Sequence, residues 1–375
     1  MSYEERRNKL YRWMAEERLS LVMFEYTETR PDPAVRWLTG HPGDGLLFLG
    51  FDRQGKSHSL LVPWDINIAL IYAQADSLVA YAEFERQPLK ALKRALGYFN
   101  TPLGSKVEIP PVTPYPLFLN YVEALIDFEV LCRNGGIHQE VETFRAVKDE
   151  EEIGIYRTLS DITNELIDAL EQHIRSGDLS TEGAVALFIE AECRKRGCEG
   201  MGFETLAAGP QRSFGIHPFP AYTGGDFATR GLSILDFGLK YAGYTSDVTL
   251  TFVRGPLSRA QERLLTLTER AYRLALAMVG EGIATKTIAA AVDTLFGNAK
   301  KSMPHALGHG IGLEAHEAPA LRNRADNDWV LKPGMIFTLE PGLYDPAQGG
   351  CRLENDILLT EAEVEVLTHA RIIRL

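Results

Sequence analysis

Three histidines, His305, His309 and His316, stand close together in SMPHALGHGIGLEAHEAP, which spans residues 302–319. An imidazole serves as a metal ligand, a hydrogen-bond donor or a proton carrier near neutral pH. Glycines on both sides of His309 let the backbone pass close to a bound group. The acidic residues that the chain brings to this segment determine which of these roles applies.

A first pair of acids is predicted on a β-hairpin formed by LDFGLKYAGYTSD, residues 235–247. The turn is expected to be centred between Tyr241 and Ala242, which sets Asp236 directly opposite Asp247. Opposed residues of antiparallel strands have Cβ atoms about 4.5–5.5 Å apart, and like charges at that separation are destabilising. This pair therefore requires a compensating charge.

A second hairpin, LEPGLYDPAQGGCRLEND, spans residues 339–356 and repeats the arrangement. Its turn, DPAQGG, sets Glu340 near Glu354. Apolar neighbours indicate that both acidic pairs are buried, and burying even one isolated carboxylate is costly. Arg352 is the one basic residue of these strands expected to point into the site. One guanidinium cannot neutralise four carboxylates.

Divalent metal ions can neutralise such a cluster. Four carboxylates and the imidazole of His309 suit two ions about 3.5–4 Å apart that share bridging carboxylates. Taken singly, each group has a simpler explanation, as a turn aspartate, a solvated strand-end glutamate or a surface histidine. Only the metal interpretation explains them together. The sequence has neither the HExxH motif of many zinc peptidases nor the GxSxG motif of a serine nucleophile.

Composition limits the class of protein. The chain has 375 residues, of which 45% are hydrophobic and 24% charged, and its formal net charge is -12. A core of ordinary size is expected, and neither nucleic acid nor an anionic membrane surface is an expected partner. The charged N-terminus does not resemble a secretion signal, and no apolar run has the length of a membrane span. The four cysteines lack CxxC spacing, so a cytoplasmic chain with free thiols is expected.

Two domains are predicted. In residues 1–138, helical and strand periodicities alternate, as in a smaller α/β domain. The expected helices span residues 8–17 and 88–99, and the expected strands span residues 19–26, 45–51, 59–64, 106–110 and 128–132. Residues 139–375 form the second domain, in which two helices, a histidine and two strands occur twice in the same order. Its helices are expected at 150–175, 181–196, 258–279 and 286–299, the third starting with a capping box at Ser258 and Gln261.

The acids and the histidine, in this order, resemble the Asp-Asp-His-Glu-Glu ligand set of the pita-bread metallopeptidases (M24), which include methionine aminopeptidase, aminopeptidase P and prolidase. The matching segments are LDFGLKYAGYTSDVT, GHGIGLEAHE, TLEPGLY and CRLEND, all in the second domain. The resemblance implies an α+β, pita-bread fold with an internal pseudo-two-fold axis. The first domain is similar to the one that precedes the catalytic domain in prolidases and creatinases.

The resemblance also implies roles for individual residues. Two divalent ions, Mn, Co or Zn, would be held by five ligands. Asp236 would bind one ion, Asp247 and Glu354 would bridge both, and His309 and Glu340 would complete the other. A bridging water would attack the scissile carbonyl while Glu340 transfers its proton. Outside the ligand set, the resemblance implies substrate contacts for His217 and His316, and for Arg352 a contact with the ligand carboxylates or with the substrate's C-terminus.

Within the family, a separate first domain argues against an ordinary methionine aminopeptidase, and the short connection from Glu340 to Glu354 favours prolidase or the shorter aminopeptidases P. Of these, a cytoplasmic Xaa-Pro dipeptidase acting on short peptides is the preferred prediction. Alternatives are aminopeptidase P, a peptidase without proline preference and a non-enzymatic protein-binding relative. A homodimer is implied by the resemblance alone. The chain departs from the common family pattern near the site, and Arg212 is either a surface residue or one that recognises an acidic group. The changed positions are Arg212, Phe214, Ile216 and Leu250.

Overall fold

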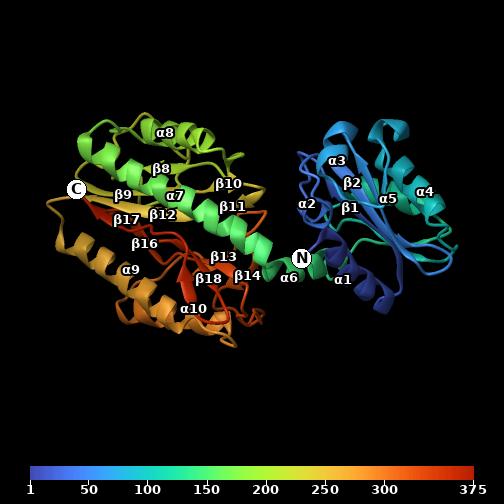
Figure 1. Ribbon diagram of the computed structural model, residues 1–375. Helices are drawn as coiled ribbons and strands as arrows, with labels where there is room; N and C mark the ends of the chain where they lie inside the picture. The colour runs from blue at the N-terminus through green and yellow to red at the C-terminus, as the bar shows by residue number, and fades with distance from the viewer. The chain divides into compact units, whose positions relative to one another are not determined.

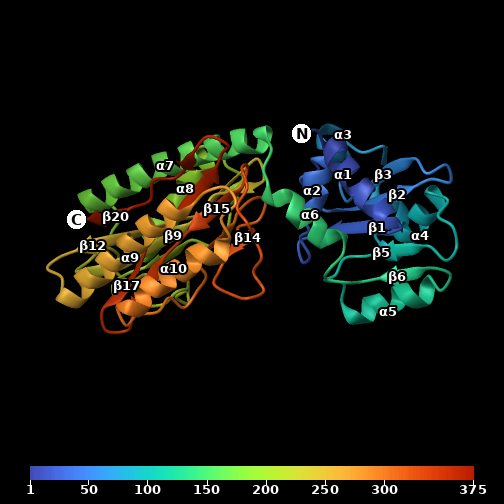
Figure 2. The same ribbon diagram turned by 90° about the horizontal axis from the view of Figure 1, so that it is seen from below.

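A computed structural model describes residues 1–375. The chain forms two compact units, Met1–Phe144 and Arg145–Leu375 (Figures 1 and 2). Helix α6 (Ile137–Ala146) runs across the boundary between them. The division predicted after residue 138 falls inside this helix, and the extent of the two folding domains stays a prediction.

The first unit contains one mixed six-stranded sheet. The β1–β2 and β2–β3 pairs are antiparallel, whereas β1–β5, β5–β6 and β3–β4 are parallel. The strand order is β4 (Ser77–Leu78), β3 (Ser57–Pro63), β2 (Gly45–Phe51), β1 (Leu19–Tyr26), β5 (Lys106–Glu108) and β6 (Glu129–Leu131). The helices are α1 (Tyr3–Glu16), α2 (Ala34–Thr39), α3 (Ile66–Tyr72), η1 (Tyr81–Phe84), α4 (Pro88–Tyr98) and α5 (Tyr115–Ala124).

The central strands of this sheet are buried along almost their whole length, which explains why their sequences read as continuous apolar runs. On one face, alternate residues such as Leu21, Phe48 and Val62 join a core completed by α4 and η1. The neighbouring residues, such as Val22 and Leu47, are buried as well. The predicted strands and both predicted helices are present, but the short helices α2, α3 and α5 were not predicted.

In the second unit, two helix pairs flank the strands β9, β12 and β17 in Figure 1. Asp149 and Glu152 form a capping box at the start of the first helix. The predicted capping box of Ser258 and Gln261 is confirmed by reciprocal side-chain and backbone hydrogen bonds. The pairs are α7 (Glu150–Ser176) with α8 (Glu182–Lys195) and α9 (Arg259–Met278) with α10 (Thr285–Asn298).

The strands of this unit form four small sheets. A three-stranded sheet has the order β11 (Tyr244–Thr245), β10 (Leu239–Tyr241), β7 (Gly200–Met201). A four-stranded sheet has the order β20 (Ile372–Arg374), β12 (Val248–Arg254), β9 (Gly231–Phe237), β8 (Leu206–Ala208). A five-stranded sheet has the order β14 (Glu317–Leu321), β13 (Gly308–Gly310), β15 (Ile336–Leu339), β18 (Asn355–Leu359), β19 (Val364–Val366). The hairpin β16 (Gly342–Asp345) and β17 (Gly349–Arg352) completes the set.

The register of the first acidic hairpin differs from the predicted one. Asp236 lies opposite Thr249, not Asp247. The turn is centred between Ala242 and Gly243, because these two residues adopt positive φ angles of 49° and 88°. This shifts the pairing by two residues. Because side chains alternate with period two, the shift keeps Asp236 and Asp247 on the same face of the sheet.

The second acidic hairpin has the predicted register. Leu339 pairs with Asn355, and Gly342 pairs with Arg352. The residues between them, Glu340 and Glu354, therefore face each other. A β-bridge between Thr249 and Glu354 joins the two hairpins, so acids from both halves of the repeat meet at one place.

The helices and the surface add two observations. None of the helices is both long enough and apolar enough to cross a membrane.

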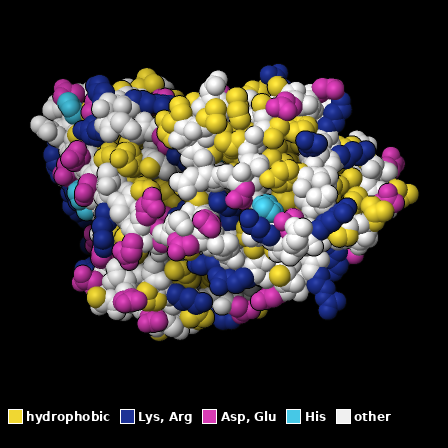
Figure 3. Space-filling model, turned by 45° about the vertical axis from the view of Figure 1, so that its right-hand side comes forward, with side chains coloured by type: hydrophobic (Ala, Val, Ile, Leu, Met, Phe, Trp, Pro, Cys, Tyr) yellow, Lys and Arg dark blue, Asp and Glu magenta, His cyan; other side chains and the backbone are white.

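On the face drawn in Figure 3, Lys and Arg side chains are interspersed with Asp and Glu side chains and form no single patch.

The positive φ of Ala242 generates a prediction for the hairpin turn. Ala242→Asn should stabilise the protein by roughly 0.5–1 kcal/mol, because Asn tolerates this conformation and Asn-Gly is the preferred pair in such turns. Ala242→Val should destabilise it by roughly 1–2 kcal/mol, because a β-branched side chain is disfavoured there. Urea unfolding measures both free energies. Shifts of the same sign in the two variants would contradict the turn geometry.

Candidate active site

A cavity of about 460 Å³ in the second unit brings together every residue predicted for the site. The five predicted metal ligands line its floor and walls together with three other histidines, His217, His305 and His316. Arg352 lies there as well. The ligand candidates are Asp236 on β9, Asp247 before β12, His309 on β13, Glu340 after β15 and Glu354 before β18.

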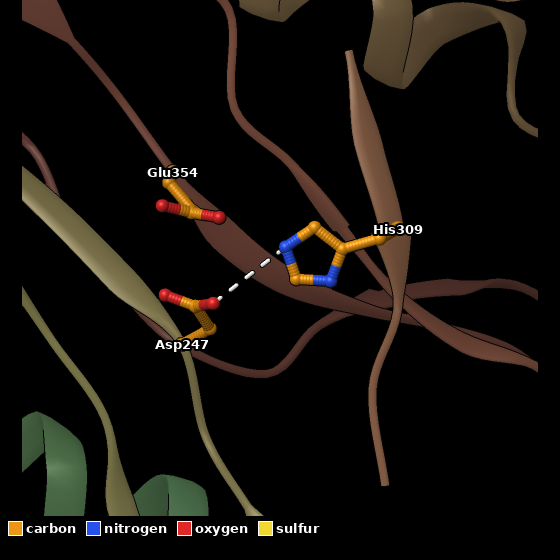
Figure 4. A group of neighbouring side chains, drawn as sticks. All are labelled: Asp247, His309 and Glu354. Carbon is orange, nitrogen blue, oxygen red and sulfur yellow. Dashed lines mark ion pairs between the residues drawn. The ribbon is translucent and has the colours of Figure 1, made fainter. Parts of the chain in front are cut away.

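Asp247, His309 and Glu354 form the tightest group. Each offers one ligand atom, and these atoms lie within 4.8 Å of one another. Figure 4 shows the three side chains pointing toward a common centre from three different strand segments. The Nε2 atom of His309 is 3.6 Å from Asp247 Oδ2 and 3.8 Å from Glu340 Oε1.

The orientation of His309 is fixed by its own segment. Its Nδ1 atom donates to the carbonyl oxygen of Gly310 at 3.1 Å, which leaves the Nε2 lone pair directed at the acids. The flanking glycines are required by close packing. A Cβ atom at Gly308 would lie 2.0 Å from Thr338 O, and one at Gly310 would lie 1.9 Å from Ala318 O. Burial lowers the pKa of His309 to about 3, so the ring is neutral and able to coordinate a metal.

The remaining acids complete the cluster from both sides. Asp236 pairs through one oxygen with Arg352, whereas its Oδ1 atom is buried without a hydrogen-bond partner. Glu340 Oε2 lies 3.5 Å from His305 Nδ1. The hydroxyl of Thr249 donates to Glu354 at 2.7 Å, which orients that carboxylate.

The acids raise one another's pKa values. Burial is the largest cause, and the negative charge of neighbouring acids adds to it. The pKa of Glu354 rises to about 7 through burial and the charge of Asp236. Burial raises the pKa of Asp247 well above its usual value, as does the charge of Glu354. The pKa of Glu340 rises for the same reasons. Without a further positive charge, these carboxylates are not stable as anions.

Arg352 supplies the only full positive charge inside the cluster. Its side chain is 2% exposed and almost every donor is occupied. Nε donates to Thr249 at 2.9 Å, and Nη1 donates to Tyr344 at 2.9 Å and to the carbonyl oxygen of Ile216 at 3.3 Å. Nη2 pairs with Asp236. Of its two predicted roles, the geometry favours holding a ligand carboxylate over contacting the substrate's C-terminus.

The other histidines stand around the acids. The ring of His316 packs against that of His309 with centroids 4.2 Å apart. His305 contacts the hydroxyl of Tyr344 through Nε2 at 3.0 Å. His217 lines the cavity on the loop before β9. His217 and His316 can donate hydrogen bonds to a group bound in the cavity, whereas the Nδ1 atom of His305 donates to the carbonyl oxygen of Ala306 at 2.8 Å.

Of the four residues that depart from the common family pattern, only Ile216 lines the cavity. Arg212 pairs with Glu182 and donates to the carbonyl oxygen of Pro220, so it braces a loop and is not available for an acidic substrate group. Leu250 is fully buried opposite Leu235.

The structure also identifies residues that were not predicted. Tyr344 lies four residues after Glu340 and is bonded to both Arg352 and His305. Asp356, fully buried, accepts a hydrogen bond from the backbone of Asp247 at 3.2 Å. Arg322 lines the cavity two residues beyond Ala320, the strand partner of His309. Arg322 directly follows β14, so its position at the cavity could be inferred only by extending the alternation of that strand by one residue.

The donor set fits divalent cations. Three buried carboxylates, the partly buried carboxylate of Glu340 and one correctly oriented imidazole converge, and one carboxylate oxygen lacks any partner. Oxygen-rich sites with an imidazole accept ions such as Mn, Co and Zn.

Comparison with known proteins supports the interpretation of this cavity as a metal site. A model of metallopeptidase family M24 matches residues 154–361. An uncharacterized peptidase from Methanocaldococcus jannaschii is 31% identical over 63% of this chain and 67% of that protein. A prolidase from Thermococcus sibiricus has a TM-score of 0.84 at 24% identity, covering 100% of both chains. An Xaa-Pro dipeptidase from Bacillus anthracis has a TM-score of 0.83 at 25% identity, also covering 100% of both. The predicted pita-bread fold class is therefore confirmed.

The raised pKa of Glu354 predicts that this residue lowers the stability of the metal-free protein as pH rises, whereas the lowered pKa of His309 acts in the opposite direction at acidic pH. Protonated Glu354 contributes stability below its unfolded pKa of 4.5, and this contribution is lost as pH rises through the folded value of about 7. At about 1.4 kcal/mol for each pKa unit, Glu354 alone accounts for roughly 3 kcal/mol. Urea unfolding in EDTA between pH 4.5 and 8 measures the slope of stability against pH, and Glu354→Gln should make this slope more positive than in the wild type. Equal slopes in the wild type and the variant would contradict this account.

Proposed function

Because the chain belongs to metallopeptidase family M24, we propose that it hydrolyses the Xaa-Pro bond of dipeptides with the help of two divalent metal ions. The observation that carries the proposal is the convergence of four carboxylates, three of them buried, and the Nε2 atom of His309 in one cavity. Such a cluster is unfavourable alone and favourable around cations.

Five residues would hold the ions. Asp236 would bind one, His309 and Glu340 would bind the other, and Asp247 and Glu354 would be shared. When bound, two divalent ions lower the pKa of water and polarise a carbonyl group. The position of Asp247 and Glu354 beside His309 supports their assignment as shared ligands.

The side chains around the ions have different roles in the proposed hydrolysis. Glu340 takes a proton from the attacking water and delivers it to the leaving nitrogen. His316 and His217 donate hydrogen bonds to the negative charge that develops on the carbonyl oxygen. Arg352 orients Asp236 through their ion pair, and its charge opposes the rise in the pKa of Asp236 that burial causes.

The preference for dipeptides rests on the distribution of positive charge in the cavity. Arg322 and Arg352 are its only lysine or arginine residues. The donors of Arg352 are engaged by Asp236, Thr249, Tyr344 and Ile216. Arg322 is exposed and has no side-chain partner, so its guanidinium is available. We propose that it binds the C-terminal carboxylate of the substrate.

The preference for proline is supported by the apolar part of the cavity wall, which includes Phe203, Leu206 and Ile216. A pyrrolidine ring is compact and apolar and suits such a wall. The Bacillus anthracis relative is an Xaa-Pro dipeptidase, which supports the same specificity. The second unit, as the catalytic domain, would carry out this reaction in a cytoplasmic homodimer.

Metal content and substrate preference test the proposal directly. The purified protein should hold close to two divalent ions per chain, and Asp247→Asn should abolish both tight binding and turnover. A panel of Ala-Pro, Ala-Pro-Ala and Ala-Ala with added Mn²⁺, Co²⁺ or Zn²⁺ should give highest kcat/KM for Ala-Pro. Preference for the tripeptide would indicate aminopeptidase P. Full metal content in Asp247→Asn would contradict its bridging role.

The role of Arg322 has its own test. Arg322→Gln should lower kcat/KM for Ala-Pro about 10- to 100-fold, because a charge-assisted hydrogen bond is lost. Ala-prolinamide, which lacks the carboxylate, should be affected much less. Arg324→Gln is the matched control, since Arg324 pairs with Asp326 and does not line the cavity. Equal losses on both substrates in Arg322→Gln would refute carboxylate recognition.

A further inference from the structure

Two cysteines lie at the C-terminal end of helix α8, one in its last turn and one just after it, in the sequence CRKRGC, residues 193–198. Gly197 has a φ of 81° and terminates the helix. The backbone N–H of Cys198 donates to the carbonyl oxygen of Cys193 at 3.2 Å, and that of Gly197 donates to Arg194 at 3.1 Å. These two bonds define a Schellman motif, in which the side chains of the first and last residues are brought into contact. Here both side chains are thiols.

The turn places these two thiols at the same end of α8, joined by the backbone hydrogen bond between their residues. The Cys193 thiol itself donates to the carbonyl oxygen of Gly200 at 3.1 Å. Both are buried, at 0% and 6% exposure, although Lys195 and Gly197 of the intervening turn are exposed. A disulfide needs Cα atoms roughly 4.4–6.8 Å apart. The backbone hydrogen bond between the same two residues keeps them near one another without any change of fold.

The other cysteines lie in different surroundings. Cys132 donates to the carbonyl oxygens of Pro110 and Pro111 in the first unit. Cys351 is fully buried on β17, beside Thr251 and Thr268. All four cysteines are free thiols. The pair at the end of α8 is therefore the site at which an intramolecular bridge is geometrically favoured.

We propose that Cys193 and Cys198 are a modification site that forms a reversible disulfide when the protein meets a two-electron oxidant such as hydrogen peroxide. The Cys193 thiolate attacks one peroxide oxygen, which yields a sulfenic acid and, after protonation, one water. The Cys198 sulfur then attacks the sulfenic sulfur, the S–S bond forms and a second water leaves. Two thiols and one peroxide thus become one disulfide and two waters, and a thiol reductant reverses the step.

Local chemistry supports this order of events. The neighbouring Cys198 thiol lowers the pKa of Cys193, and Arg194 adds to this effect while burial opposes it. Cys198 lies two residues before β7, and the intervening Glu199 N donates to Lys240 O at 2.6 Å. This strand is followed by Phe203 at the cavity wall. The bridge would therefore tie the end of α8 to the segment that leads into the active site.

Tryptic mapping of the oxidised wild-type protein tests the proposal without relying on catalysis. Trypsin cleaves after Arg194, Lys195 and Arg196, so the disulfide would hold the peptides 176–194 and 197–212 together. After peroxide treatment and alkylation under denaturing conditions, two of the four thiols should resist alkylation. The linked peptides should appear and should separate on reduction.

Matched variants complete the experiment. Cys132→Ser and Cys351→Ser should retain the linked peptides, whereas Cys193→Ser and Cys198→Ser should lose them. Alkylation of all four thiols in the oxidised wild type would overturn the proposal, as would disulfide-linked dimers without the internal bridge. Neither result would bear on the proposed peptidase activity, which the substrate panel tests separately.

Discussion

Repulsion among buried carboxylates is the constraint on which the second unit depends. Asp247, Glu340 and Glu354 are held within one cavity by strands from both halves of the repeat, and burial together with their neighbours' charges raises their pKa values. A single guanidinium, that of Arg352, enters the cluster. The chain therefore maintains an arrangement that is unfavourable in the metal-free state and becomes favourable when cations are bound.

The fold supports this arrangement by placing the acids on strands or directly beside their ends. A β-bridge between Thr249 and Glu354 joins the two hairpins, and the hydroxyl of Thr249 contacts both Glu354 and Arg352. The histidine comes from a third strand whose glycines pack directly against neighbouring backbone. Strands surrounded by a well-packed core hold ligand geometry better than loops do, because their positions are over-determined by hydrogen bonds. This explains why the repulsive groups do not simply separate.

Much of the fold and of the candidate site could be predicted from the sequence, for identifiable reasons. The strands of the first unit were recognisable because both faces are buried, and the hairpin of Glu340 and Glu354 because its turn has a strong sequence signal. The predicted pairing of Asp236 with Asp247 was wrong because the turn includes Ala242 at a position with positive φ, which a sequence pattern assigns to glycine. Tyr344, Asp356 and Arg322 were not predicted because their roles depend on which strands become neighbours. Pairings between distant strands are tertiary information that local periodicity does not contain.

The central claim is that divalent cations relieve the repulsion among these acids. Anomalous diffraction from crystals grown with Mn²⁺ tests it most directly, since it locates the ions independently of activity. The account predicts two anomalous peaks about 3.5–4 Å apart, with carboxylate oxygens of Asp247 and Glu354 between them and the Nε2 atom of His309 beside one. Ordered acids with no peak among them, or manganese bound only elsewhere, would contradict it.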